Sequence, residues 1–314
     1  MTQVKPHTQH DVSEDLIASV DLVASGGEDI FPAKPNLSFV AKGIIFGEGP
    51  VWDKRSEQLF FSDICGDAIY RWKPGSEAEE ILAPTDHANG MTLDQEGRLV
   101  VCGWGGRTVF RFEKDGTLKT LAALWQGKKL NSPNDIVVKS DGMIYFTDPP
   151  GGMYNVGHVG SDIQRYQEYQ PVFRMAPDGS QLSIVTTDFV YPNGLCFSPD
   201  EKILYVNCSR ERLIRCYDVQ ADGSVKNGRI FYKYDQPEHG NPDGIKCDVQ
   251  GRVWCTGPGG ILVHNPNGDL VARLRMKGHP TNFCFGSNDW KTIYITMLGS
   301  VTQMRVNVAG VPSW

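Results

Sequence analysis

Polar positions and apolar runs alternate along this chain in a repeating order. Six segments open with a carboxylate or carboxamide side chain and continue into apolar residues, namely EGPVW, NGMTL, NDIVV, NGLCF, DGIKC and NFCF, which begin at Glu48, Asn89, Asn134, Asn193, Asp243 and Asn282. A β-rich run such as LFFSD or IYFTD follows each opening residue ten or eleven positions later. Polar residues and strands that repeat together, roughly every 40 residues or somewhat more, predict the blades of a propeller.

The segments between the repeats carry hairpin signals. KDG, PDG, ADG and PNG each separate two strand-like runs, for example TVFRFEKDGTLKTLAAL and PVFRMAPDGSQLSIVTT. Short turns with glycine between alternating runs favour antiparallel hairpins. We therefore expect an all-β, six-bladed β-propeller with four antiparallel strands per blade, in which each opening polar residue begins an innermost strand. The six opening residues, called the ring residues below, would then face one central axis.

The two ends of the chain predict how the ring closes. Residues 1–37 contain no repeat and are expected to form an N-terminal arm, while residues 38–314 form the propeller domain. The sixth unit ends with SVTQMRVNVAGVPSW and is one strand short. The N-terminal strand LSFVAKGIIF would complete it, which would close the ring and leave no sheet edge open.

Composition narrows the class of protein. The chain has 314 residues and a formal net charge of −6, with no basic stripe for nucleic acid. No secretory signal is visible, and no segment reaches the roughly 20 apolar residues that span a bilayer. The eight cysteines lack a CxxC pair and are expected to be reduced thiols packed in strands. We expect a cytoplasmic monomer or homodimer.

The motifs together resemble one family. EGPVW, NSPNDIVVKSDGMIYFTDPP, YPNGLCFSPDEKILYV and NPDGIKCDVQGRVWCTG, in this order, are similar to the gluconolactonase, senescence marker protein and luciferin-regenerating enzyme family of six-bladed propellers. The resemblance covers about residues 38–309. It implies a divalent metal on the axis held by Glu48, Asn193 and Asp243, with Asn134 as a further ligand or a contact to substrate.

The chemistry of these side chains agrees with that implication. Two carboxylates and two carboxamides make an all-oxygen shell that suits a hard cation. Ca²⁺ is the first choice, and Zn²⁺, Mg²⁺ or Mn²⁺ are alternatives. Because Ca²⁺ usually takes about six to eight oxygens, open positions would remain for water or substrate.

Lactone hydrolysis is the leading hypothesis for the reaction. The metal would polarise the lactone carbonyl, and Asp243 would be the catalytic base that activates water. One alternative is a phosphotriesterase of the diisopropylfluorophosphatase kind, which uses a similar oxygen shell. The other is a noncatalytic calcium-binding propeller.

Further residues are assigned around this site. Asn134, Asn89, His279 and Tyr191 are expected to bind substrate, and His87 or His279 to be candidates for moving protons. Asp135 is expected to point outward and cap a turn. Trp104, Tyr154 and Tyr191 would form an apolar wall or lid.

Two positions depart from the family that the motifs resemble. Ser132 stands where the animal members have an arginine that contacts sugar hydroxyls, and Gly151 replaces an aromatic residue that follows DPP in many bacterial members. The resemblance therefore leaves open whether the lactone is a sugar lactone or a less polar one.

Overall fold

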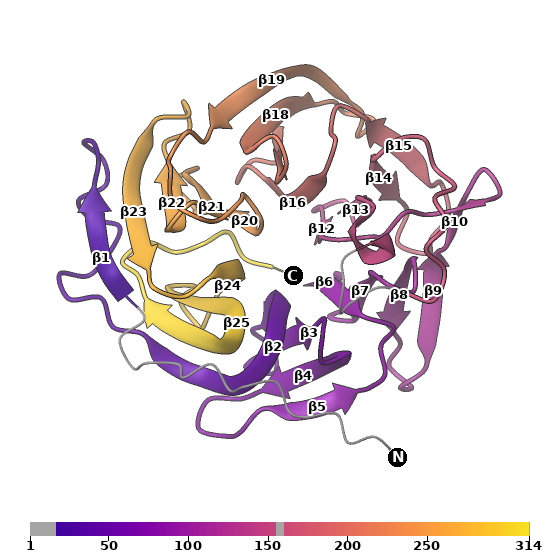
Figure 1. The fold of residues 1–314 in the computed structure, drawn as a ribbon, viewed down its shortest axis with the longest axis horizontal. Helices are drawn as coiled ribbons and strands as arrows, with labels where there is room; N and C mark the ends of the chain where they lie inside the picture. The colour runs from indigo at the N-terminus through magenta and orange to yellow at the C-terminus, as the bar shows by residue number, and fades with distance from the viewer. Residues whose placement is uncertain (1–16, 155–159, 314) are drawn as a thin grey trace.

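The computed structural model describes residues 17–154 and 160–313. Within these residues the chain is almost entirely β-structure, with one short 3-10 helix, η1 (Gly151–Met153). The sheets stand around a common axis as in a propeller, so the all-β propeller prediction is confirmed (Figure 1).

The sheets follow one another in chain order around the axis. Three sheets have four strands each. The first contains β6 (Ala88–Leu93), β7 (Leu99–Gly103), β8 (Thr108–Phe112) and β9 (Leu118–Ala122), and the second contains β12 (Ile136–Val138), β13 (Ile144–Thr147), β14 (Val172–Met175) and β15 (Ser183–Thr186). The third contains β16 (Pro192–Phe197), β17 (Ile203–Cys208), β18 (Leu213–Val219) and β19 (Val225–Lys233). A five-stranded sheet contains β20 (Ile245–Cys247), β21 (Val253–Gly257), β22 (Gly260–His264), β23 (Leu270–Met276) and, at its outer edge, β1 (Ile17–Leu22). A small ribbon pairs β10 (Leu124–Trp125) with β11 (Lys128–Lys129).

The first and last units of the chain share one sheet. It has six strands in the order β24 (Pro280–Gly286), β25 (Thr292–Arg305), β2 (Ser38–Asp53), β3 (Gln58–Asp63), β4 (Ala68–Trp72) and β5 (Glu79–Leu82). Five sheets of four or more strands therefore form in the described chain, rather than the six separate blades expected. The reason is the length of β2, which pairs with β25 along residues 38–46 and with β3 along residues 47–53.

The turn chemistry explains the hairpins that build each sheet. The glycine of KDG, Gly116, has φ of +83° between β8 and β9, and that of PDG, Gly179, has φ of +91° between β14 and β15. Glycine adopts this left-handed conformation without steric cost. The hairpins predicted at KDG, PDG, ADG and PNG are confirmed by the strand pairings on either side.

The apolar core lies between neighbouring sheets and not at a single centre. Innermost strands such as β6, β16 and β24 are buried at every position, because sheets cover both of their faces. Trp52 of β2 stacks on Tyr294 of β25 with ring centroids 5.1 Å apart. All eight cysteines are free, and all except Cys65 are buried, as predicted.

The axis holds a cavity that is closed at one end by the chain itself. Residues of all six innermost strands (β2, β6, β12, β16, β20 and β24) line a cavity of about 100 Å³, together with Val311–Ser313 of the C-terminal tail. Figure 1 shows the segment after β25 running to the centre of the ring. The tail is fixed by hydrogen bonds from Val311 N to Cys247 O (3.0 Å) and from Ser313 Oγ to Trp52 O (3.0 Å).

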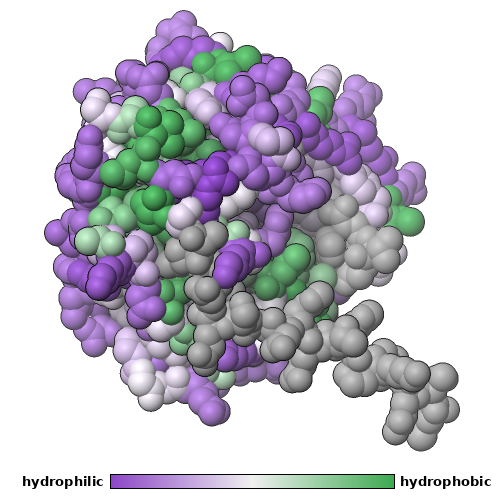
Figure 2. Space-filling model, turned by 60° about the vertical axis from the view of Figure 1, so that its left-hand side comes forward, coloured by the Kyte–Doolittle hydropathy of each residue, from purple (hydrophilic) through white to green (hydrophobic). Residues whose placement is uncertain are grey.

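The outer surface is mainly hydrophilic on the face shown in Figure 2, where apolar areas are interrupted by polar residues. Strand β1 lies at the outside and pairs with β23. Residues 1–16 of the expected arm lie outside the described residues, and the division into arm and domain stays a prediction. None of the described helices has the length and hydropathy of a membrane span.

Candidate active site

The ring residues stand at the same end of the innermost strands. Four lie within the strands β2, β6, β16 and β24, and the other two, Asn134 and Asp243, lie two residues before β12 and β20. Five ring residues are buried, each less than 8% exposed. Asp243 alone keeps partial solvent access.

The glycine after a ring residue sets the spacing of the ring. A Cβ at Gly90 would lie 2.4 Å from the carbonyl oxygen of Asn134, and one at Gly194 would lie 2.1 Å from that of Asp243. A Cβ at Gly244 would lie 2.1 Å from Oδ1 of Asn282. The NG and DG pairs therefore serve the close approach of neighbouring innermost strands, and they are not turn signals at these places.

Hydroxyl and amide side chains on the second strands lock this arrangement. Ser62 Oγ donates to Asn89 O (2.9 Å), and Thr147 Oγ1 donates to Asn193 O (2.7 Å). Asn207 Nδ2 donates to Asp243 O. The polar residues at the ends of the FFSD, YFTD and YVNC runs therefore hold the backbone of the next ring residue in place.

The carboxylate of Glu48 is buried among polar groups. Its Oε2 accepts hydrogen bonds from Gly49 N and from Asn282 Nδ2, both at 2.9 Å. The pKa of Glu48 is raised to about 7. Burial is the main cause and the negative charge of Asp135 acts in the same direction, while the two hydrogen bonds and Lys246 act against the shift. Glu48 and Asn282 therefore belong to one contiguous polar cluster.

The carboxylate of Asp243 lies in the same electrostatic field. Burial raises the pKa of Asp243 well above its usual range, and the charges of Glu48 and Asp135 add to this effect. A hydrogen bond with Asn193 and the charge of Lys246 act in the opposite direction. The charge of Glu48 and a hydrogen bond with Asn193 thus both act on the carboxylate of Asp243, so these three ring residues lie close together.

The direction of Asp135 was predicted incorrectly from the sequence, and Lys246 was not identified as a residue of the site. Asp135 is buried, and its Oδ2 lies 3.7 Å from Nζ of Lys246, so the prediction that it points outward is wrong. It does form the expected local hydrogen bond, because Oδ1 accepts from Ile136 N at 2.9 Å. Lys246 Nζ also lies 3.4 Å from Asn282 Oδ1. A lysine inside the apolar strand IKC was the signal that could have revealed this cluster.

The cluster fits a cation by its charge and its free oxygens. Three carboxylates, Glu48, Asp135 and Asp243, face one ammonium group, Lys246, which leaves an excess of two negative charges when all are ionised. The buried oxygens Asn89 Oδ1 and Asp135 Oδ2 have no hydrogen-bond partner. Over residues 17–154 and 160–313, no group of three or more His, Cys, Asp or Glu side chains is arranged to hold a metal. The ring offers a different set, because it combines two carboxylates with carboxamide oxygens. This oxygen-rich cluster is the observation that favours a hard cation.

Asn134 and Asn89 are held by backbone contacts at the ring. Asn134 N donates to Thr147 O (2.9 Å), and Asn134 O accepts from Gly90 N (2.8 Å). Asn89 has its carbonyl oxygen bonded to Ser62, while its side-chain oxygen is free. Both side chains therefore belong to the ring, where their predicted contacts to substrate stay predictions.

The C-terminal tail covers one end of the axis. It binds the backbone of Cys247 and Trp52, which follow the ring residues Asp243 and Glu48 by four positions. The tail thus covers the end at which the innermost strands finish. The opposite end, at which these strands begin, is called the mouth below.

Aromatic residues and η1 pack together at the mouth. A Cβ at Gly151 would lie 2.2 Å from both Tyr191 Oη and Trp104 Cη2, so glycine is required there. Ser132 is fully buried and bridges this region, since its Oγ donates to Trp104 O and accepts from Gly152 N, both at 2.8 Å. Trp104 and Tyr191 therefore lie together, and Ser132 helps to position Trp104. The wall or lid for substrate that was expected from Trp104, Tyr154 and Tyr191 stays a prediction.

The two candidate histidines differ in their surroundings. The His87 ring is tied through Nδ1 to Ile64 O (2.8 Å), and its backbone N–H donates to Asp67 (2.7 Å). His279 lies at the surface, but neighbouring protein groups reduce the hydration of its ring, and this desolvation lowers its pKa. A contact of His279 with substrate stays a prediction.

Asp148 supports the loop that carries Asn134. Its Oδ2 and Oδ1 accept the backbone N–H groups of Asn131 and Ser132, both at 2.8 Å, and burial raises its pKa to about 7. Because the folded state holds this proton up to a higher pH than the unfolded state, the contribution of Asp148 to the unfolding free energy falls as pH rises between about 4 and 7.

We expect Asp148→Asn to be less stable than the native protein, because the amide places an N–H donor against a backbone donor, at a cost of about 1–3 kcal/mol. The difference should shrink by about 2 kcal/mol between pH 5 and pH 8. Urea unfolding at both pH values measures it, with the exposed Asp235→Asn as the control. A difference that grows with pH would contradict the assigned direction of the pKa shift.

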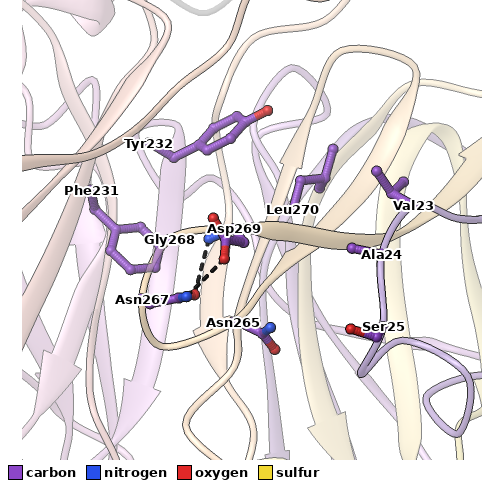
Figure 3. Close-up of a pocket in the computed structure, with 10 residues that line it drawn as sticks. All are labelled: Val23, Ala24, Ser25, Phe231, Tyr232, Asn265, Asn267, Gly268, Asp269 and Leu270. Carbon is purple, nitrogen blue, oxygen red and sulfur yellow. Dashed lines mark hydrogen bonds between the residues drawn. The ribbon is translucent and has the colours of Figure 1, made fainter.

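A larger hollow lies at the outer rim and is not the candidate site. It measures about 620 Å³ and is lined by residues 23–25, by Phe231 and Tyr232, and by the turn before β23 (Figure 3). The carboxylate among these lining residues, Asp269, is bonded to Asn267 Nδ2 at 2.7 Å. None of the ring residues lines it, so it offers no convergent chemistry.

Comparisons with known proteins agree on one family. The family model described as "SMP-30/Gluconolactonase/LRE-like region" matches residues 46–299. The gluconolactonase of Zymomonas mobilis is 32% identical over 300 residues, covering 87% of this chain and 82% of that protein. The structure of XC5397 from Xanthomonas campestris, described as a gluconolactonase, superposes with a TM-score of 0.85 at 28% identity, covering 93% of this chain and 96% of that one. Regucalcin from Agrobacterium tumefaciens, described as a calcium-binding protein, is similar in fold, with a TM-score of 0.73 at 17% identity over 88% of this chain and 96% of that one.

Proposed function

Because the chain belongs to the SMP-30/Gluconolactonase/LRE-like family, we propose that it hydrolyses a lactone at the ring residues. The family resemblance of the motifs is confirmed by these comparisons. The single observation that carries the proposal is the buried polar cluster around Glu48 and Asp243, in which Asp243 keeps partial solvent access. Related gluconolactonases make a sugar lactone the first substrate class.

Asp243 is the proposed base. It is the ring carboxylate that water can reach, and Asn207 and Asn193 hold it in place through its backbone and side chain. In the reaction, Asp243 takes a proton from water as the water oxygen bonds to the carbonyl carbon. The bond from that carbon to the ring oxygen then breaks, and the ring oxygen gains a proton that balances the one Asp243 took from water. The product leaves as a hydroxy acid.

The proposed ligands of a divalent ion are Glu48, Asn134, Asn193 and Asp243, with Ca²⁺ as first choice on the basis of the oxygen donors. When bound, such an ion supplies a Lewis acid for the carbonyl oxygen and compensates the surplus negative charge. Side chains of this cluster also position and balance one another independently of the ion. Asn282 orients Glu48, Lys246 offsets Asp135, and Ser209 Oγ accepts from Asn193 Nδ2 at 2.9 Å.

We also propose that the ring has six blades. The shared six-stranded sheet counts as two blades when β2 is divided where its pairing changes from β25 to β3, near Phe46 and Gly47. Its first half is then the N-terminal strand that closes the ring. The cavity lined by six innermost strands supports this count.

The proposal is tested with a panel of substrates. Hydrolysis of aldonolactones, a homoserine lactone, an aromatic lactone and a phosphotriester is followed by pH change, after chelation and after return of Ca²⁺, Mg²⁺, Mn²⁺ or Zn²⁺. We expect lactone hydrolysis that is lost with chelator and restored by a divalent ion. Hydrolysis of the phosphotriester alone would replace the proposal with the phosphotriesterase reading, and no hydrolysis with any ion would leave a binding protein.

A further inference from the structure

An arginine at the mouth lies beside the ring residues. Arg210 directly follows Ser209, whose Oγ accepts from Asn193 Nδ2 (2.9 Å) and donates to Pro242 O (2.7 Å), next to Asp243. Ser209 N also donates to Tyr191 O at 3.2 Å. The residue before Arg210 is thus anchored to the proposed metal ligand Asn193 and to Pro242, which precedes the ligand Asp243.

The guanidinium of Arg210 is positioned by two tyrosines. Its Cζ lies 5.3 Å from the ring centroid of Tyr154 and 5.2 Å from that of Tyr191, and Nη2 donates to Tyr154 Oη at 2.5 Å. Tyr154 immediately follows η1, which packs against Trp104 and Tyr191. Cation–π contacts with two rings restrict the planar group and reduce the entropy lost when it binds a ligand.

Arg210 lacks a carboxylate partner in the part of the chain that the structure describes. Among the described residues, no Asp or Glu forms an ion pair with Arg210, and the neighbouring Glu211 acts on the Cys208 thiol instead. Arg165 adds a second positive charge that acts on Tyr154, and it bonds only to the backbone oxygens of Gln167 and Glu168 in the described chain. In a protein of net charge −6, two arginines that act on Tyr154 and have no acidic partner among the described residues indicate an anionic ligand.

We propose that Arg210 selects a lactone that carries an ionised carboxylate in addition to its ring ester. The inference rests on the proposed lactone hydrolysis. A guanidinium binds a carboxylate through two parallel hydrogen bonds. Since the acidic ring residues Glu48 and Asp243 disfavour a free anion in the ring, the carboxylate end is held at Arg210 and the ester end enters the ring. Arg210 therefore determines both specificity and orientation.

The test compares two lactones of one sugar. An aldaric acid γ-lactone carries a carboxylate where the aldonic acid γ-lactone of the same configuration carries a hydroxymethyl group. We expect kcat/KM of the native protein to favour the aldaric lactone, and Arg210→Met to lower that value about 10- to 100-fold, chiefly through KM, since hydrogen bonds to charged groups contribute about 1.5–3 kcal/mol. The aldonic lactone should change less than about 3-fold, and the preference should weaken with added salt.

Matched variants separate recognition from folding. Arg71→Met removes the same charge from an exposed ion pair on β4 and should leave the preference unchanged, while Arg210→Lys should give an intermediate value. Equal use of both lactones by the native protein and by Arg210→Met would overturn the inference and leave lactone hydrolysis intact. If the native protein hydrolyses neither lactone, the proposed sugar-lactone substrate class fails, and the wider panel decides lactone hydrolysis itself. Calorimetric titration with the aldarate dianion then tests the anion site separately. Binding that is lost in Arg210→Met supports the site, and no binding to the native protein overturns it.

Discussion

Asp243→Asn should lower kcat for lactone hydrolysis about 100- to 10,000-fold, the range expected when a general base is removed. The amide retains an oxygen that can face a cation but cannot accept a proton from water at neutral pH. The hydrogen bond from Asn207 to the backbone of this residue does not depend on the side chain, so the fold should be preserved. Stopped-flow or pH-monitored assays measure the rate.

The control for this variant is the exposed Asp235→Asn, which makes the same chemical change away from the ring. Thermal melting should match between the two variants. Both are assayed in excess divalent ion, because Asp243→Asn removes a ligand charge and is expected to weaken the ion site. A rate within about 10-fold of the native value in Asp243→Asn, with metal still bound, would assign the base to another group.

Glu48→Gln should weaken binding of a divalent ion about 100-fold or more, because the charge of the ligands sets the affinity of oxygen sites for Ca²⁺. Activity should fall in parallel unless excess ion is supplied. The metal-free variant should be at least as stable as the metal-free native protein. The reason is that Gln removes a buried charge near Asp135, while its amide oxygen can still accept from Gly49 N and Asn282 Nδ2.

Calorimetric titration with Ca²⁺ and urea unfolding in chelator measure the two effects separately. The exposed Glu77→Gln serves as the control and should change neither quantity. An unchanged affinity for Ca²⁺ in Glu48→Gln would remove this residue from the ligand set. A large loss of stability in chelator would show that its carboxylate has a structural role that the amide cannot fill.

The repeat in the sequence was sufficient to predict the β-structure and the place of the ring residues. Five polar residues lie just before or near the start of an innermost strand, and Glu48 lies near the start of the part of β2 that pairs with β3. A residue at that position must satisfy backbone groups at the axis, while the following residues enter the apolar core. The role of Gly90, Gly194 and Gly244 was not readable, since the contacts that exclude a Cβ come from the neighbouring sheet.

Other features depended on contacts between distant segments. Asp135 precedes β12 and lies in a loop, where the alternation of strand residues does not apply, so its direction was assigned wrongly. The merging of the first and last units results from the uninterrupted length of β2. The path of the tail to the axis and the stacking of Arg210 on two tyrosines link residues that no local pattern connects.

The most direct test of the ring is a crystal structure of the chelated protein soaked in Mn²⁺, with anomalous scattering used to locate the ion. One peak on the axis, within bonding distance of oxygens of Glu48, Asn193 and Asp243, is the result that we predict. A protein that hydrolyses lactones in excess chelator, and whose crystals show no peak among these side chains, would contradict the account.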